Sequence, residues 1–402
     1  MRSEGMRGIR LLSQQEIRCG QRWIYSAGFN VGRALADTGR IDEELPAIER
    51  LLDAGARVAV LSHQGKGVDD ANELDFVADY IADRLGRTVG YFPGNATPDA
   101  VDRAHALRAG EAVVFGNTRK YAGEMTNSAE LAGRFAALGD CAAIGGFSKA
   151  HRAHASNVGL LGHRPAFAAD SLVHETELLA PWAGSADEQY SVAVLGGVKP
   201  EKTAIGLEHL TATYDLVIPG GAVLNNLLRA LGHDIGSSTV GSHPEKCLQV
   251  SRNVLNRANR AELHIPDEVV IARPTGRDFA DARTVPVSRG VPPDYAIVDF
   301  VLAPWVRARL DHLTSRGGRA FIAGTPARYT EGFTRALDAL LGALRHDRVN
   351  ALLLGGDTTA DLPWNGAKST GGGSALHYLA YGTCPVFDAL RTNALHWEEA
   401  TL

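Results

Sequence analysis

The chain carries one especially informative stretch, Ser148-Lys149-Ala150-His151-Arg152-Ala153-His154-Ala155-Ser156-Asn157-Val158. Two histidines and an arginine fall within four positions, His151 to His154, and small residues flank them. Imidazole and guanidinium groups donate hydrogen bonds and carry positive charge, and small neighbours leave room for a ligand beside them. The stretch therefore predicts an anion-binding loop, although taken alone it also fits a helix end with a satisfied polar face.

This string resembles a segment of phosphoglycerate kinase, and other segments resemble that family in the same order along the chain. The segments similar to its acceptor-substrate loops are Gly28-Phe29-Asn30-Val31, Ser62-His63-Gln64-Gly65-Lys66-Gly67 and Gly116-Asn117-Thr118-Arg119-Lys120. Those similar to its nucleotide-side loops are Leu195-Gly196-Gly197-Val198-Lys199, Leu354-Gly355-Gly356-Asp357-Thr358 and Ser369-Thr370-Gly371-Gly372-Gly373. The shared order predicts homology over roughly residues 20 to 390.

Short apolar runs predict strands that are buried on both faces of parallel sheets. These runs are Arg57–Leu61, Ala112–Phe115, Ala142–Ile144, Ser191–Leu195, Leu216–Ile218, Ala320–Ala323 and Ala351–Leu354. The amphipathic stretches Glu43–Ala54 and Asn72–Leu85 predict helices between strands. A chain of 402 residues exceeds what one hydrophobic core usually serves. We therefore expect two doubly wound parallel-sheet, Rossmann-like α/β domains joined by a hinge helix.

The expected domains are an N-terminal acceptor-substrate domain over residues 1–185 and a C-terminal nucleotide-binding domain over residues 186–380. The acidic, proline-broken stretch from Ser171 to Gln189 is predicted to connect them. The resemblance implies that the segment 381–402 returns to the N-terminal domain.

The bulk composition excludes several classes of protein. Hydrophobic residues make up 45% and charged residues 22%, which is typical of soluble globular proteins. The net charge of −5 argues against a nucleic-acid surface, and no apolar run approaches the length that spans a bilayer. The four cysteines lack a pairing or metal-binding spacing, which favours reduced thiols. We therefore expect a cytoplasmic monomer that has neither nucleic-acid nor membrane partners.

The nucleotide-side loops contain groups suited to phosphates. The turn at Gly355 follows a buried strand and opens a helical stretch, so its N–H groups can face phosphates while Asp357 reaches Mg²⁺. Such a turn is common, and its pairing with Gly371-Gly372-Gly373 strengthens the prediction. The resemblance implies ATP and Mg²⁺ as cofactors, with Asp357 as the metal ligand. The cofactor-binding residues that it implies are Gly196, Gly197, Lys199, Lys202, Gly220, Gly221, Glu331, Gly355, Gly356, Asp357 and Thr358.

The family places two lysines after Gly197. Here the second, Lys202, comes one position early, and Thr203 stands where an ungapped match would put it. The resemblance implies Arg40 as the cation that neutralises the phosphoryl group in flight. The catalytic residues expected from it are Arg40, Lys202, Gly372 and Gly373. The acceptor-binding residues, which would hold an anionic carboxylate substrate, are Asn30, His63, Lys66, Arg119, His151, Arg152 and His154.

Departures from the family pattern concentrate at the acceptor. Where the family has an arginine and an aspartate in the first loop, this chain has Ser26 and Gly28, and that aspartate contacts the glycerate hydroxyl. Lys66 replaces an arginine, which keeps the charge but loses bidentate geometry. Other replacements are Gly116 for an acid, Lys120 for an aromatic residue, and Gly145-Gly146-Phe147 where an aspartate is expected. We expect Arg33 and Lys120 to supply compensating charge.

Around the nucleotide base, the sequence also differs from the family. Ala323-Gly324-Thr325-Pro326 stands in place of a Trp-Asn-Gly-Pro turn, and Val301 and Leu354 replace glycines. Glu331 keeps the position of the ribose-binding acid. ATP is the nucleotide that we expect, with another triphosphate as the alternative.

These features together predict ATP-dependent phosphoryl transfer to a carboxylate of an acid other than 3-phosphoglycerate, in specialised biosynthesis. One alternative is a ligase that couples the acyl phosphate to a second, nucleophilic substrate. Two others are a genuine 3-phosphoglycerate kinase and a nucleotide-binding homologue without turnover.

Overall fold

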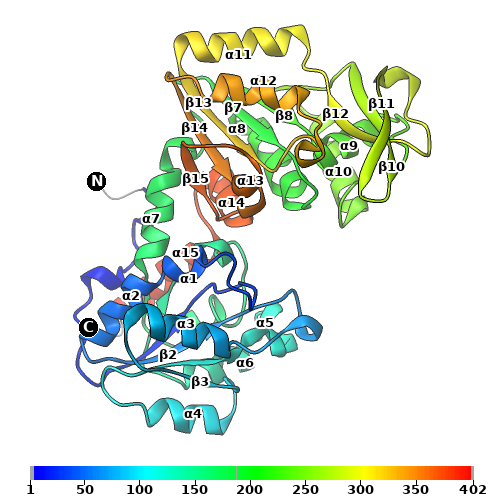
Figure 1. Cartoon of the computed structure of the whole chain (residues 1–402). Helices are drawn as coiled ribbons and strands as arrows, with labels where there is room; N and C mark the ends of the chain where they lie inside the picture. The colour runs from blue at the N-terminus through cyan, green and yellow to red at the C-terminus, as the bar shows by residue number, and fades with distance from the viewer. Residues whose placement is uncertain (1–3, 187, 400–402) are drawn as a thin grey trace. The chain divides into compact units, whose positions relative to one another are not determined.

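The computed structural model describes residues 4–186 and 188–399, which form two compact units (Figure 1). The boundaries fall between Glu177 and Leu178 and between Gly382 and Thr383, so unit 1 contains both ends of the described chain and unit 2 lies between them. Parts of the predicted segments 1–185, 171–189 and 381–402 lie outside the described residues.

Unit 1 is built on a sheet of parallel strands in the order β3-β4-β2-β1-β5-β6. The strands are β1 Arg22–Ser26, β2 Arg57–Ser62, β3 Val89–Phe92, β4 Ala112–Asn117, β5 Cys141–Ile144 and β6 Ala166–Ala168. The helices are α1 Gly39–Asp42, α2 Leu45–Asp53, α3 Asp75–Leu85, α4 Pro98–His105, α5 Ala122–Met125, α6 Ala129–Ala136, α7 Asp170–Leu179 and α15 Pro385–Glu399. The predicted strands and helices of this unit are therefore confirmed, with small shifts of their ends.

Unit 2 repeats the plan, with a parallel sheet in the order β15-β14-β13-β7-β8-β9. The strands are β7 Ser191–Leu195, β8 Leu216–Pro219, β9 Glu262–Leu263, β13 Gly318–Ala323, β14 Val349–Leu354 and β15 Ala367–Ser369. The helices are α8 Glu208–Thr213, α9 Gly221–Ala230, α10 Pro244–Leu255, α11 Pro304–Arg316, α12 Arg335–Leu344, α13 Gly356–Asp361 and α14 Gly373–Tyr381. The fold class predicted from the sequence is confirmed.

The sequence did not predict a second sheet in unit 2. This antiparallel sheet joins β10 Glu268–Thr275, β11 Asp278–Pro286 and β12 Ala296–Phe300 in the order β11-β10-β12. A π-helical turn over Lys202–Leu207, just before α8, was also not foreseen.

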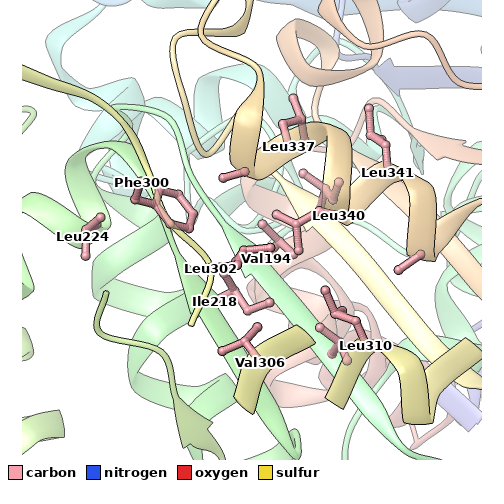
Figure 2. Close-up of a cluster of buried hydrophobic side chains, with 14 of the residues drawn as sticks. Val194, Ile218, Leu224, Phe300, Leu302, Val306, Leu310, Leu337, Leu340 and Leu341 are labelled. Atoms are coloured by element: carbon pink, nitrogen blue, oxygen red, sulfur yellow. The ribbon is translucent and has the colours of Figure 1, made fainter. Parts of the chain in front are cut away.

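Apolar side chains from both faces of the sheets make the cores. In unit 2, Val194 of β7 and Ile218 of β8 meet Leu310 of α11 and Leu340 of α12 (Figure 2). In unit 1, α2 buries five residues at helical spacing, which are Leu45, Ala47, Ile48, Leu51 and Leu52. None of the described helices combines the length and the hydropathy that crossing a bilayer requires.

The segment after α7 belongs to unit 2 because its polar groups are satisfied there. Trp182 Nε1 donates to Asn350 O at 2.9 Å, and the buried Arg319 donates through Nη1 to Pro181 O at 3.2 Å. The first boundary therefore lies at Glu177, before the position expected from the sequence.

The last helix, α15, completes unit 1 (Figure 1). Its buried Asn393 accepts hydrogen bonds through Oδ1 from Arg10 Nη2 at 2.6 Å and Ala166 N at 2.9 Å. The Nδ2 group of Asn393 donates to Leu161 O at 2.6 Å. One side chain thus ties the N-terminal segment, β6 and α15 together.

Candidate functional site

Both parallel sheets reverse their strand order beside their first strand. In unit 1, β1 lies between β2 and β5, and in unit 2, β7 lies between β13 and β8. Ligands of doubly wound sheets bind beyond the carboxyl ends of the strands at such a reversal. The predicted site residues follow the carboxyl ends of β1, β2, β4 and β5 in unit 1 and of β7, β8, β13, β14 and β15 in unit 2, so the topology brings each set together within its own unit.

The loop after β5 is held by one asparagine. Asn157 Oδ1 accepts from His154 N at 2.9 Å and Val158 N at 2.6 Å, and its Nδ2 donates to Arg152 O at 2.9 Å. These bonds close the backbone around the three predicted anion-binding side chains. Asn157 therefore fixes the backbone of this loop from within.

The cationic side chains of unit 1 form one cluster. Burial and the nearby charges of Arg119, Lys149 and Arg152 hold the pKa of His63 well below its usual range. The same causes lower the pKa of His154 to about 3. Both imidazoles are therefore neutral near pH 7, and the positive charge of the cluster comes from the arginines and the lysine.

Arg119 is the clearest sign that this cluster expects a ligand. Its residue is 2% exposed, and its Nε and Nη1 atoms have no hydrogen-bond partner among the described residues. Buried polar groups are nearly always hydrogen-bonded in native proteins. Guanidinium N–H groups without a protein partner are available to the oxygens of an oxyanion.

Lys149 joins the cluster, although no role was predicted for it from the sequence. Its Nζ donates to Ser26 Oγ at 2.6 Å, and Ser26 Oγ donates to Ser156 O at 2.6 Å. The expectation that Arg33 and Lys120 supply compensating charge is not supported, because these exposed or half-buried cations pair with Asp75 and Glu73. The buried cation that the structure adds to the predicted cluster is Lys149.

A carboxyl group from another element fills the space beside the glycines after β5. Glu44, at the start of α2, accepts from Gly146 N through Oε1 at 2.6 Å and from the Tyr25 hydroxyl through Oε2. A Cβ at Gly145 would overlap Glu44 Oε2. Burial raises the pKa of Glu44. Gly145 is thus required by packing, and the sequence offered no signal for Glu44.

The remaining acceptor-side residues lie on neighbouring loops. Arg40 of α1 donates through Nη1 to Asn30 O at 3.2 Å, and Asn30 Oδ1 accepts from Gly65 N at 3.1 Å. Lys66 is exposed, while His151 Nε2 accepts from Arg152 Nε at 3.3 Å. Asn30 therefore links the first and second loops, and Arg40 is attached to the first.

In unit 2, Lys199 and Asp357 meet across two loops. Lys199 Nζ lies 2.9 Å from Asp357 Oδ2, and both side chains are largely exposed. Gly355 has a φ of +102°, which favours glycine. A Cβ added at Gly355 would lie 4.0 Å from Gly372 Cα. The N-termini of α13 and α14 are therefore neighbours, with Gly373 as the first residue of α14. The N-terminus of a helix favours anions, so these two neighbouring N-termini offer an anion site beside the lysine.

Lys202 is the first residue of the π-helical turn. Lys202 is 6% exposed, and burial together with Lys199 lowers its pKa to about 8, while Glu201 and Asp357 oppose this shift. Thr203 instead shares a hydrogen bond with Cys247. Lys202 therefore belongs to the electrostatic environment of the Lys199–Asp357 pair, and Thr203 faces α10. Single π-turns in helices occur often at functional sites.

Other predicted nucleotide residues line or support one cavity of about 160 Å³. Gly197, Gly221 and Glu331 line it, and Glu331 pairs with Arg328 at 3.3 Å. Its volume is below the ~300–1,000 Å³ of most ligand pockets, so much of a nucleotide would lie on the exposed loops. A Cβ at Gly196 or Gly220 would overlap the Thr325-Pro326 backbone, so these two glycines serve loop packing.

Thr358 has a supporting role. It is buried, and its Oγ1 accepts from Gly324 N at 3.1 Å, which fixes the loop after β13. Gly356 opens α13 and lacks any near neighbour for a Cβ. A hollow of about 570 Å³ near Trp364 lies at the amino ends of β14 and β15, where doubly wound sheets do not bind ligands.

The residues of unit 2 fit a metal that is shared with a nucleotide. Among the described residues, no group of three or more His, Cys, Asp or Glu side chains forms a metal site. Mg²⁺ typically binds through one or two carboxylates together with substrate phosphates and waters. Asp357 is an exposed carboxylate beside the proposed phosphate groups, which meets that requirement.

Comparison with known proteins identifies the family. A sequence profile described as phosphoglycerate kinase matches residues 20–381. The phosphoglycerate kinase of Azorhizobium caulinodans is 33% identical over 405 residues, covering 95% of this chain and 99% of that protein. That of Thermus thermophilus is 31% identical, covering 92% and 97%. The solved structure of the Coxiella burnetii phosphoglycerate kinase gives a TM-score of 0.72 at 26% identity, covering 96% and 100%. The Pyrococcus horikoshii enzyme gives 0.75 at 21%, covering 96% and 100%, which supports the fold. This chain belongs to the phosphoglycerate kinase family.

Proposed function

We propose that this chain transfers the γ-phosphoryl group of ATP to the carboxylate of an acid other than 3-phosphoglycerate. Membership of the family supports ATP-dependent transfer to a carboxylate, and enzymes of this family use ATP with Mg²⁺. The altered acceptor and a place in specialised biosynthesis are our own extension, in a chain that we propose acts in the cytoplasm.

The proposed roles follow from the needs of phosphoryl transfer, which are positioning and the neutralisation of charge. Lys199, Lys202 and the backbone N–H groups before α13 and α14 would bind the nucleotide phosphates. Asp357 would hold Mg²⁺, which neutralises charge on phosphate oxygens when bound. Arg40 would stabilise the charge of the migrating group, since its guanidinium stays protonated in proteins.

The observation that carries the altered acceptor is the loss of side chains from the first loop while the basic cluster is retained. Gly28 has no acceptor for a hydroxyl group, and a Cβ there would lie 3.0 Å from Gly146 Cα, so the two backbones fill that space. Arg119 still presents unsatisfied buried N–H groups. The pocket therefore favours an anion, without the carboxylate that the resemblance assigns to recognition of the glycerate hydroxyl.

A screen of carboxylic acids for ATP consumption tests this function. Hydroxylamine traps a released acyl phosphate, so an acid that is phosphorylated gives a hydroxamate. The Arg40→Ala variant serves as the inactive control. We expect turnover with at least one acid and poor turnover with 3-phosphoglycerate. Turnover of 3-phosphoglycerate at about 1–100 s⁻¹, the range usual for kinases, would refute the altered acceptor.

The same screen separates the alternatives. Without hydroxylamine or another nucleophile, a kinase would still consume ATP and a ligase would not. The relatives named above, which are phosphoglycerate kinases, give the ligase alternative no support. A binding protein without turnover would give no hydroxamate with any acid.

A further inference from the structure

Lys149 is a buried cation without an ion pair. Lys149 is 3% exposed, and within the described part of the chain Ser26 Oγ is the one hydrogen-bond partner of its Nζ. No carboxylate oxygen of the described residues lies within 4.0 Å of its Nζ. Buried charges in proteins are normally paired or bound to a ligand, because removing a charge from water costs several kcal/mol.

The nearest acids do not complete the pairing. Glu124 is buried, and its carboxylate already accepts from Thr118 Oγ1 at 3.1 Å, Ser156 Oγ at 2.6 Å and Ser156 N at 3.0 Å. Glu44 is likewise bound to Gly146 N and the Tyr25 hydroxyl. Both acids contribute only longer-range attraction to Lys149. The two carboxylates therefore organise the loops, and the ammonium group is left for another anion.

Arg119 repels Lys149 and has its own unsatisfied N–H groups. Two neighbouring buried cations are both stabilised when an anion binds between them. We propose that Lys149 is a specificity-determining residue of the acceptor site, where it and Arg119 bind one oxyanion group of the acceptor. This inference rests on the proposed function, because it concerns the acceptor of that reaction, and it adds a cation to the predicted residues.

The pH dependence of anion binding follows from the surroundings of Lys149. Burial lowers its pKa to about 8, Glu124 and Glu44 oppose this shift, and Arg119 adds to it. His63 and His154 face the same cluster, but their pKa values are lowered, so neither titrates above pH 7. Anion affinity should therefore fall as the pH rises through about 8, where Lys149 loses its charge.

Sulfate and malonate are suitable probes, because both remain dianions between pH 7 and 9. We would titrate each by calorimetry at fixed ionic strength into the wild type, Lys149→Met and the matched control Lys202→Met. Lys202 is also buried, with a pKa lowered to about 8, but it lies in unit 2. The control therefore removes the other buried lysine with a pKa of about 8, whose titration could mimic that of Lys149, and leaves the acceptor site intact.

We expect Lys149→Met to bind one of the probes about tenfold or more weakly at pH 7, as loss of a charge-assisted hydrogen bond implies, and to lose the pH dependence. Lys202→Met should keep the pH-dependent site. A larger effect on sulfate would identify a tetrahedral group, and a larger effect on malonate a second carboxylate. Unchanged binding of both probes by Lys149→Met would overturn the inference.

If Lys149→Met does not fold, the pH dependence of probe binding by Lys202→Met still tests the inference. Its affinity for the probes should fall between pH 7 and 9, and a constant affinity, or no binding, would overturn the inference. These readouts do not involve ATP. A protein that binds the probes through Lys149 but phosphorylates no acid would refute the proposed function and leave the anion site in place.

Discussion

Replacing Asp357 with alanine should change nucleotide affinity in opposite directions with and without Mg²⁺. Lys199 Nζ is 2.9 Å from Asp357 Oδ2, and the two side chains are 65% and 82% exposed. Without metal, the phosphates of ATP must compete with Asp357 for Lys199. The variant removes that competitor, so metal-free ATP should bind more tightly.

The magnitude follows from the exposure of the pair. Exposed ion pairs contribute about 0.2–1 kcal/mol, which corresponds to roughly 1.5- to 5-fold in affinity for metal-free ATP. With Mg²⁺ present, the variant loses the carboxylate that would hold the metal. We expect Mg·ATP affinity to fall about tenfold or more, as is typical when the environment of a bound metal is disturbed.

Calorimetric titration with Mg·ATP, and with ATP in EDTA, measures both effects. Asp294→Ala is a matched control, because Asp294 pairs with Arg273 at 3.0 Å in unit 2 and is 59% exposed. The control should alter neither affinity, and both variants should unfold near the wild-type temperature. Equal Mg·ATP affinity in the wild type and Asp357→Ala would remove Asp357 from the metal site, and tighter binding in both conditions would refute the metal role.

Three further outcomes are expected. Arg40→Ala should lower kcat by about 10²–10³ with little change in ATP affinity. Arg40→Lys should recover only part of the lost kcat, because an ammonium group lacks the planar fork of a guanidinium. A raised KM for the acid at constant kcat would contradict this role. Burial and Glu44 raise the pKa of Glu43 to about 8, so the folded state favours its protonated form and stability should fall as the pH rises from about 4.3 through 8. Urea midpoints at pH 5 and 8 should differ less in Glu43→Gln than in the wild type. Gly145→Ala should destabilise unit 1 by roughly 1–3 kcal/mol, because the added methyl group overlaps Glu44. The double variant with Glu44→Ala should recover part of that loss in urea unfolding. Wild-type stability of Gly145→Ala would refute the overlap with Glu44.

The sequence predicted the sheets because their strands are continuous apolar runs. Arg57–Ser62 and Ser191–Leu195 are buried along nearly their whole length, so the local hydrophobicity of the sequence is enough to predict these strands. The positions of the site loops could be predicted from these strands, because the carboxyl ends of parallel strands lie at the same edge of a sheet. The hairpin of β10 and β11 was missed, although Thr275-Gly276-Arg277-Asp278 is a turn signal, with Gly276 at φ of +76°.

The sequence patterns did not show which cations are buried in the site and which form ion pairs elsewhere. Lys149 stands among small residues that fit a surface loop, and it is buried only because β1 and β5 are neighbours and place Ser26 beside it. Arg33 and Lys120 looked like pocket cations, yet they pair with acids on other elements. These partners are distant in the sequence, so spacing carries no information about them.

The position of α15 has a consequence for synthesis of the protein. Domains usually fold in order from the N-terminus as the chain leaves the ribosome. Here Asn393 of α15 accepts hydrogen bonds from the backbone of Ala166 and the side chain of Arg10, and Phe387 of the same helix packs against Phe147. The packing of unit 1 is therefore incomplete until α15 emerges. Unit 2 is contiguous and can close first. Unit 1, most of which is translated before unit 2, therefore completes its fold after unit 2, and a premature stop before α15 would spare unit 2 while leaving unit 1 incomplete.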